Sequence, residues 1–208
     1  MPRGITKRRP LTISALLDAA LELFAERGFG ATSIPDICDR AGLTKGAFYS
    51  NFANKESLFL ALLDRSWAKR AEWIRRATPS EPWSTQPDDA SSGPSPLEID
   101  RQWTLVSMEF SLHAIRHPDV AALLVTHEHR VRSELALLIT EALERSQRIP
   151  TRPVDDLARM VVAVTEGSEI QTLTDEAAGV RGPARLGPDA VAGILGQFSM
   201  PAGDAVPR

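Results

Sequence analysis

Apolar residues recur every three or four positions along most of the chain, which is the spacing of one face of an α-helix. The first such face runs from Ile13 to Phe24. Gly28 predicts the end of this helix, because glycine readily adopts the left-handed conformation of a C-terminal cap. We find no alternating run long enough to indicate a strand. The pattern therefore predicts an all-α fold of about nine helices.

Capping signals divide the next part of the chain into short helices. Ser33, with Asp36 three residues later, predicts a capping box at the start of a second helix, and Pro35 is tolerated in its first turn. Gly42 predicts the end of that helix. Two more helices are expected after their own capping residues: 45–51 after Thr44 and 55–77 after Asn54.

Residues 78–96 interrupt the helical pattern. Five prolines lie there among Ser, Asp and Gly, which predicts a long mobile loop without regular structure. Helical periodicity then resumes, and helices are expected over 97–116, after a restart at Pro118, and over 128–146, 153–174 and 188–198. Residues 200–208 are expected to form a frayed tail.

Composition excludes several classes of protein. The chain has 208 residues, 43% of them hydrophobic, which is enough to bury a core. Its one cysteine, Cys38, excludes an intrachain disulfide and a thiolate-rich metal site. The longest apolar runs have six residues, against about 20 for a membrane span. Asp18 and Glu22 interrupt any apolar signal region, so we expect a cytoplasmic protein with no membrane partner.

The net charge of −3 conceals an uneven distribution. Residues 1–76 carry 13 basic and 8 acidic side chains, whereas residues 77–208 carry 11 basic and 19 acidic ones. A basic N-terminal third indicates a module that faces a polyanion, although ordinary fluctuation between parts of a globular protein is the alternative.

Residues 34–51 have the proportions of a helix-turn-helix, the motif that places its second helix in the major groove. Gly42 permits the sharp turn between the two helices. Lys45 is followed by two residues with almost no side chain, so this helix can approach a groove closely while its lysine reaches bases or phosphates. Tyr49 and Asn51 follow at positions from which they can reach the phosphate backbone.

The stretch Thr32 to Phe59, TSIPDICDRAGLTKGAFYSNFANKESLF, closely resembles the DNA-binding signature of the TetR family of bacterial transcriptional regulators. The preceding residues 16–33, LLDAALELFAERGFGATS, resemble the family's first helix and turn. The resemblance covers roughly residues 11–62, about a quarter of the chain. Two positions depart from the pattern, since Asn51 stands where His is more common and Cys38 where Ala is common. We interpret Cys38 as a buried packing residue.

The resemblance implies which residues contact DNA. Thr32 and Ser33 match phosphate contacts, and Lys55 matches a lysine that clamps the DNA backbone from the start of the fourth helix. The implied set is Thr32, Ser33, Thr44, Lys45, Gly46, Ala47, Tyr49, Asn51 and Lys55. The basic residues Arg3, Lys7, Arg8 and Arg9 are similar to an arm that binds phosphates or the minor groove, and simple disorder of this arm is the alternative.

The same resemblance implies two domains, a helix-turn-helix domain over 1–54 with its basic arm and a helical effector-binding and dimerisation domain over 55–208. Small residues on the last two long helices would allow a two-fold interface, with intramolecular packing as the alternative. The expected interface residues are Val161, Thr165, Ser168, Ile194 and Phe198. The expected pocket residues are Trp103, Met108, Phe110, His113 and Thr165.

Histidines raise the question of a metal. Glu109, His113 and His117 recur every four residues, with His127 and His129 nearby, but His117 precedes Pro118 at a helix end, where an imidazole can bind terminal carbonyls instead. We expect no metal, no cofactor and no enzymatic activity, since no phosphate loop or nucleophile motif is present.

The combined hypothesis is a homodimeric repressor that binds a palindromic operator in double-stranded DNA and is released by an unknown small-molecule effector. A regulator or nucleoid-associated protein without an effector is the alternative.

Overall fold

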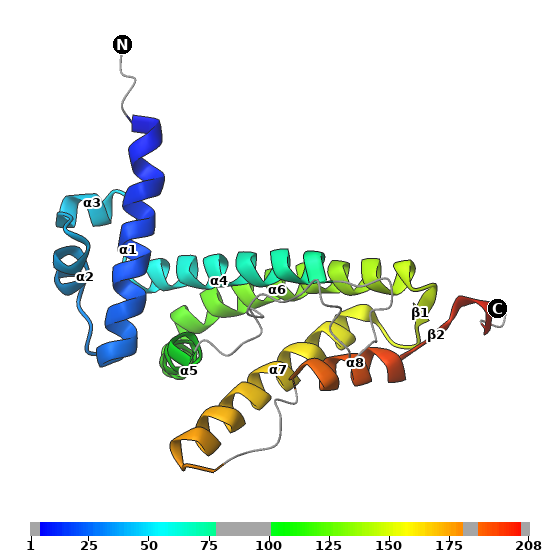
Figure 1. Ribbon diagram of the computed structural model, residues 1–208. Helices are drawn as coiled ribbons and strands as arrows, with labels where there is room; N and C mark the ends of the chain where they lie inside the picture. The colour runs from blue at the N-terminus through cyan, green and yellow to red at the C-terminus, as the bar shows by residue number, and fades with distance from the viewer. Residues whose placement is uncertain (1–4, 78–100, 181–186, 205–208) are drawn as a thin grey trace. The chain divides into compact units, whose positions relative to one another are not determined.

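The computed structural model describes residues 5–77, 101–180 and 187–204. Helices make up nearly all of this described part (Figure 1), so the predicted all-α class is confirmed. The elements are α1 (Ile5–Arg27), α2 (Ile34–Ala41), α3 (Lys45–Tyr49), α4 (Lys55–Ala77), α5 (Arg101–Arg116), α6 (Pro118–Arg145), β1 (Arg148–Pro150), α7 (Val154–Ala177), α8 (Gly187–Gln197), β2 (Ser199–Pro201) and a 3-10 turn (Ala202–Asp204). The predicted loop 78–96 lies outside the described residues.

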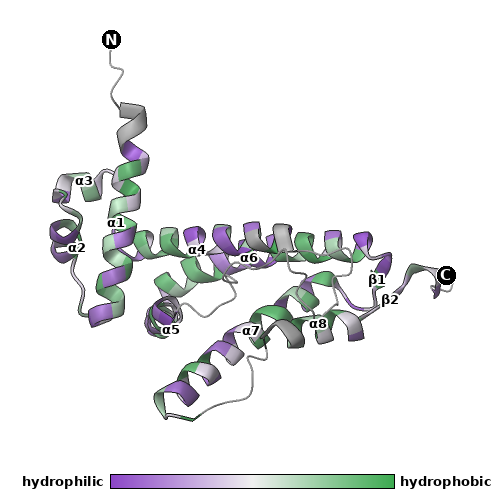
Figure 2. Cartoon of the chain, viewed as in Figure 1, coloured by the Kyte–Doolittle hydropathy of each residue, from purple (hydrophilic) through white to green (hydrophobic). Residues whose placement is uncertain are grey.

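Helix α1 is longer than its apolar pattern predicts. It begins at Ile5, well before Ile13, and contains Pro10. Its first turns are basic and polar, so they carry no apolar periodicity from which a helix could be predicted. From Leu16 onward, the predicted face is buried, and Gly28 ends the helix with φ 83°. Figure 2 shows apolar and polar residues alternating along α1 at helical spacing.

The predicted caps of α2 and α3 are confirmed. The hydroxyl of Ser33 accepts from the Asp36 N–H while the Asp36 carboxylate accepts from the Ser33 N–H, which completes the capping box. Gly42 ends α2 in the left-handed conformation, with φ 64°. The hydroxyl of Thr44 accepts from the N–H of Ala47 at 3.2 Å and so caps α3.

Packing divides the chain into two compact units, which consist of the described parts of 1–67 with 100–127 and of 68–99 with 128–208. This division differs from the predicted boundary between residues 54 and 55. The reason is the first half of α4, where Leu58, Phe59 and Leu62 are buried in the same core as α1. Helices α4 and α6 each contribute residues to both units.

The core of the first unit is built on aromatic rings. Phe59 is fully buried and stacks on Phe110 with centroids 3.9 Å apart, and it lies 5.9 Å from Phe24 and 5.6 Å from Phe29. Together with Trp103, which stacks on the same ring, these residues join α1, α4 and α5. This core includes Phe24, Phe29, Phe48, Phe52 and Phe59.

Two predictions for the second unit and its borders are wrong. Residues Pro118–Arg145 form one continuous helix, so the restart at Pro118 is confirmed but the separate helix over 128–146 is wrong, because no Gly or Pro interrupts residues 119–145. The tail is ordered through Asp204: β2 pairs antiparallel with β1, with Ile149 opposite Met200, and Arg148 donates to the hydroxyl and carbonyl of Ser199. Strands of three residues are too short to produce an alternating pattern.

Within the described ranges, no helix combines the length and apolar character required to cross a membrane.

Replacing Phe59 with Ala is predicted to lower the free energy of unfolding by about 3–5 kcal/mol, because the change leaves a cavity between α1, α4 and α5. Chemical denaturation measures this loss. Leu11→Ala is the matched control, since Leu11 is 72% exposed and its truncation is expected to change stability by less than about 0.5 kcal/mol. Equal losses in the two variants would contradict the aromatic core.

Candidate nucleic-acid interface

Helices α2 and α3 form a packed helix-turn-helix. The N–H of Leu43 donates to the carbonyl of Cys38 at 2.9 Å, which closes the turn after Gly42. Phe48 is fully buried, and its ring lies 5.7 Å from that of Phe52, so the inner face of α3 is fixed in the core of the first unit. Figure 1 shows α2 and α3 lying along one side of α1. The outer face of α3 is therefore presented on a packed support.

The outer face of α3 exposes both residues predicted for the major groove and Tyr49, which is predicted to reach the phosphate backbone. Lys45 and Gly46 are exposed, and Tyr49 is 57% exposed with its ring edge against Phe48. A Cβ added at Gly46 would meet only the Thr44 hydroxyl, at 3.7 Å, so packing within the protein does not require glycine at this position. A helix with so little bulk can approach another surface closely.

Charge on this unit is partly neutralised by internal ion pairs. Arg40 pairs with Glu22 and Glu26 at 3.0 and 2.9 Å, and Arg65 pairs with Asp18. Within the described part of the chain, Lys45 makes no ion pair. The exposed positive charge of the helix-turn-helix therefore resides at the start of α3.

Thr32, a predicted phosphate contact, has a side chain that is occupied inside the protein. Its side chain is buried, with 1% of the residue exposed, and its hydroxyl shares its one proton between the carbonyl of Gly28 at 2.8 Å and that of Leu23 at 3.2 Å. The hydroxyl thus satisfies backbone carbonyls at the end of α1. Ser33 beside it is exposed, although its hydroxyl belongs to the capping box of α2.

Lys55 is also occupied inside the protein. Its ammonium donates to the carbonyls of Phe29 at 2.5 Å and Thr32 at 2.7 Å, and it lies 4.3 Å from the centroid of the Phe29 ring. Burial lowers the pKa of this lysine, which fits an ammonium withdrawn from water. In this conformation the Lys55 ammonium binds the backbone of the α1–α2 turn.

The side chain of Asn51, a third predicted phosphate contact, also has partners inside the protein. Its amide nitrogen donates to the carbonyl of Ala47 at 2.8 Å, and its oxygen accepts from Nε of Arg9 at 3.1 Å. Of the predicted basic arm, Arg3 lies outside the described residues, while Lys7, Arg8 and Arg9 lie on α1. The described part of the predicted arm thus forms the first turns of α1.

Sequence reasoning missed Glu109 as a structural residue. Its carboxylate accepts from the N–H of Phe29 at 2.7 Å, which ties α5 to the turn after α1. A Cβ at Gly28 would lie 2.8 Å from this carboxylate, so the glycine is required both for its positive φ and for this close approach. The two partners are 80 residues apart in sequence, and no local signal connects them.

The neighbouring histidines act as structural residues. Nδ1 of His117 lies 2.7 Å from the carbonyl of His113, which confirms that His117 binds a terminal carbonyl of α5. The His113 ring packs 4.9 Å from that of Phe29, and burial, assisted by the charge on His117, lowers its pKa. Among the described residues, no group of three or more His, Cys, Asp or Glu side chains is placed to hold a metal.

The predicted effector-pocket residues are distributed over both compact units. Trp103 and Phe110 are buried in the core of the first unit, Met108 is 40% exposed, and Thr165 belongs to the second unit, where its hydroxyl donates to the carbonyl of Val161. Aromatic residues line pockets and also fill cores, so their residue type does not distinguish the two roles.

The remaining predicted residues lie on described elements. The expected interface residues are all half-buried on α7, α8 and the position that follows α8: Val161, Thr165, Ser168, Ile194 and Phe198. Cys38 is buried, and burial raises the pKa of its thiol, which confirms its interpretation as a packing residue.

Replacing Gly28 with Ala is predicted to destabilise the protein by about 1–3 kcal/mol, because a side chain there is strained and displaces Glu109. Gly30→Ala is the matched control, since a Cβ at Gly30 meets nothing within 4 Å. Thermal denaturation measures both variants. Glu109→Ala is then added to Gly28→Ala in a double variant. If the double variant recovers none of the stability lost in Gly28→Ala, the close approach of the Glu109 carboxylate does not cause that loss.

Comparisons with known proteins agree with this arrangement. Residues 16–62 match the bacterial regulatory proteins of the tetR family, and residues 95–195 match the C-terminal part of BetI-type transcriptional repressors. The transcriptional activator FasR of Mycolicibacterium smegmatis is 40% identical over 62 residues, covering 30% of this chain and 28% of FasR. The transcriptional repressor KstR2 of Rhodococcus jostii is 54% identical over 43 residues, covering 21% of each chain. The matches thus span less than a third of these two relatives.

Solved structures share the fold over nearly the whole chain. The fatty acid degradation regulator FadR of Bacillus halodurans has a TM-score of 0.63 at 15% identity, covering 88% of this chain and 94% of its own. GusR of Salmonella enterica has a TM-score of 0.61 at 19% identity, covering 89% and 94%. The chain belongs to the TetR family of bacterial transcriptional regulators, with its DNA-binding helix-turn-helix near the N-terminus.

Proposed function

We propose that this regulator is a repressor that binds a palindromic operator as a homodimer and is released from DNA by a small molecule. The observation that carries the proposal is the outer face of α3, where Lys45, Gly46 and Tyr49 are exposed on a helix whose inner face is buried. The similarity of residues 95–195 to BetI-type repressors supports repression as the direction of control.

The roles of the exposed residues follow from their chemistry. Lys45 at the start of α3 supplies a cation for base edges or phosphates in the major groove, and Gly46 with Ala47 allows the helix to approach closely. Tyr49 donates its exposed hydroxyl to a backbone phosphate. Thr44 and Ser33 border the same helices, and their hydroxyls already cap α3 and α2, so we assign them a supporting role.

Dimerisation is proposed through α7 and α8. These helices pack against each other, yet Val161, Thr165 and Ile194 remain half-buried in the single chain, as does Ser168. Apolar and small side chains in this state are covered further when two copies form a four-helix interface about a two-fold axis. Such symmetry places two α3 helices on one face of DNA, and successive major grooves require about 34–36 Å between them.

For an effector to release the DNA, its binding elsewhere in the chain must alter the distance between the two α3 helices of the dimer. Helices α4 and α6 contribute residues to both compact units, so a shift in either helix reaches the unit that carries α3. Glu109 extends this connection, because it binds the turn between α1 and α2 directly from α5. A coupling free energy of about 1–3 kcal/mol is typical of such linked sites. We assign the effector no chemical class.

Selection of bound DNA from a random pool tests the proposal. Purified protein is expected to enrich a two-fold symmetric sequence. Lys45→Ala is expected to weaken binding to that sequence and to alter the base preference at the positions nearest α3. The matched control is Lys69→Ala, which removes the same charge from an exposed position on α4 outside the helix-turn-helix and is expected to leave the preference unchanged.

The absence of any enriched sequence would contradict operator binding, and an enriched sequence without two-fold symmetry would contradict the dimer. Compounds are then screened for release of the selected DNA. DNA affinity that stays unchanged across a broad metabolite panel would favour a regulator without an effector.

A further inference from the structure

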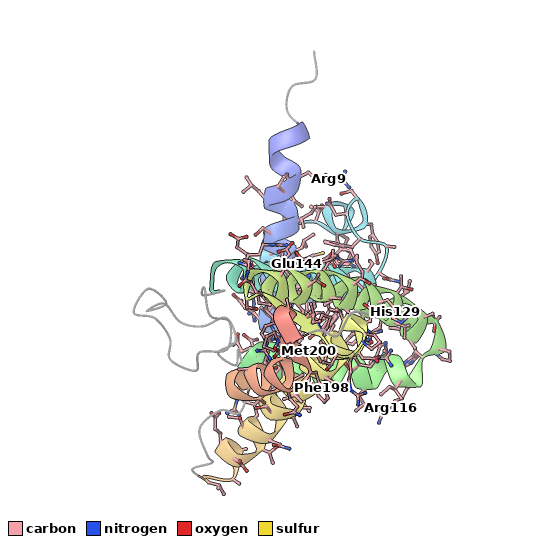
Figure 3. The ribbon with its side chains drawn as sticks, turned by 90° about the vertical axis from the view of Figure 1, so that its right-hand side faces the viewer. Arg9, Arg116, His129, Glu144, Phe198 and Met200 are labelled. Carbon is pink, nitrogen blue, oxygen red and sulfur yellow. The ribbon has the colours of Figure 1, made fainter. Side chains whose placement is uncertain are left out.

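The first turns of α1 extend past α3 in the first compact unit, as Figure 1 shows. Arg9 lies on this extension and is exposed. Its Nε donates to the side-chain oxygen of Asn51 at 3.1 Å, across 42 residues of sequence, and Figure 3 labels Arg9 near the free end of the helix. The bond connects the N-terminal extension of α1 to the residues that directly follow α3.

The amide of Asn51 is fixed by its other contacts. Its nitrogen donates to the carbonyl of Ala47 at 2.8 Å and lies 3.2 Å from the hydroxyl of Ser50. A carbonyl accepts only from the nitrogen end of an amide, so the oxygen end must face Arg9. Because its amide nitrogen and its amide oxygen both have partners inside the protein, Asn51 positions Arg9 and is not available to bind a phosphate itself.

The bond from Nε leaves the outer edge of the guanidinium open. Arginine has five N–H donors in a planar fork, so four remain on the two terminal nitrogens of Arg9. Within the described residues, no carboxylate pairs with this side chain. A guanidinium held at Nε presents its two terminal nitrogens together, which is the geometry that binds two oxygens of one phosphate.

The helical setting of Arg9 reduces the entropic cost of such a contact. Pro10 lacks an N–H and therefore cannot donate to the carbonyl of Thr6, so the first turns of α1 lack one of their own hydrogen bonds. The side-chain bond from Arg9 to Asn51 ties this weakened part of α1 to α3. An ordered arginine loses less conformational freedom on binding than one in a loose arm.

We propose that Arg9 is a DNA-contacting residue that binds a backbone phosphate beside the groove entered by α3, and that Asn51 positions it. The proposal rests on the proposed function, because it extends the contact surface of α3 to the first turns of α1. It also replaces the direct phosphate contact that the sequence predicts for Asn51. Arg9 then contributes from an ordered helix.

Binding to the selected operator is measured as a function of salt for the full chain and its variants. Arg9→Ala is expected to weaken binding about tenfold at low salt and to reduce the slope of log affinity against log salt by about 0.9, the value for one lost phosphate contact. Asn51→Ala is expected to weaken binding less, because the guanidinium is still present but is no longer held. In the double variant, Asn51→Ala is expected to add nothing to the loss caused by Arg9→Ala.

Arg27→Ala is the matched control, since Arg27 is an exposed arginine in the last turn of the same helix. It is expected to leave affinity and slope close to wild type. Arg9→Lys provides a second test that preserves the charge but not the fork: it is expected to retain the salt slope and to lose affinity. Thermal unfolding of each variant confirms that the protein is folded.

An unchanged slope and affinity in Arg9→Ala would overturn the proposal. A loss in Asn51→Ala that adds fully to that of Arg9→Ala would also overturn it, since Asn51 would then contact DNA independently. Failure of the wild-type chain to bind any selected DNA would instead contradict the proposed function, so the two failures are distinguishable.

Discussion

The structure of the first compact unit depends on the hydrogen bonds that side chains make to the backbone of the α1–α2 turn. Where α1 ends, the carbonyls of Gly28, Phe29 and Thr32 and the N–H of Phe29 face the interior of the unit. Side chains from three places bind them: the hydroxyl of Thr32 itself, the ammonium of Lys55 on α4 and the carboxylate of Glu109 on α5. A buried polar group without a partner costs about 1–3 kcal/mol, so these bonds hold the turn in one conformation.

This polar junction explains why the compact unit is larger than a three-helix DNA-binding domain. Lys55 and Glu109 approach the same turn from α4 and α5, and the stacked rings of Phe59 and Phe110 join those helices directly beneath it. The helix-turn-helix is thus attached to α5 by both polar and apolar contacts. Within the first compact unit, α5 is therefore in direct contact with the turn that leads into the helix-turn-helix.

Much of the fold could be predicted from the sequence because its signals are local. Ser33, Gly42 and Thr44 act on backbone groups within three or four residues, so the caps of α2 and α3 follow from spacing alone. The roles of Lys55 and Asn51 could not be predicted in this way. Their partners lie 23 to 42 residues away and are either backbone carbonyls or an arginine in a stretch without apolar periodicity. A resemblance assigns a role to a position, whereas the folded chain decides which partner the side chain reaches.

Lys55 stabilises the α1–α2 turn from inside the protein, and one variant tests this role directly. In Lys55→Met, the free energy of unfolding and the salt dependence of operator binding are determined on the same protein. We predict a loss of stability of about 1–3 kcal/mol with an unchanged salt slope, because the ammonium binds the carbonyls of Phe29 and Thr32. Unchanged stability with a slope reduced by about 0.9 would show that Lys55 binds a phosphate and would contradict this account.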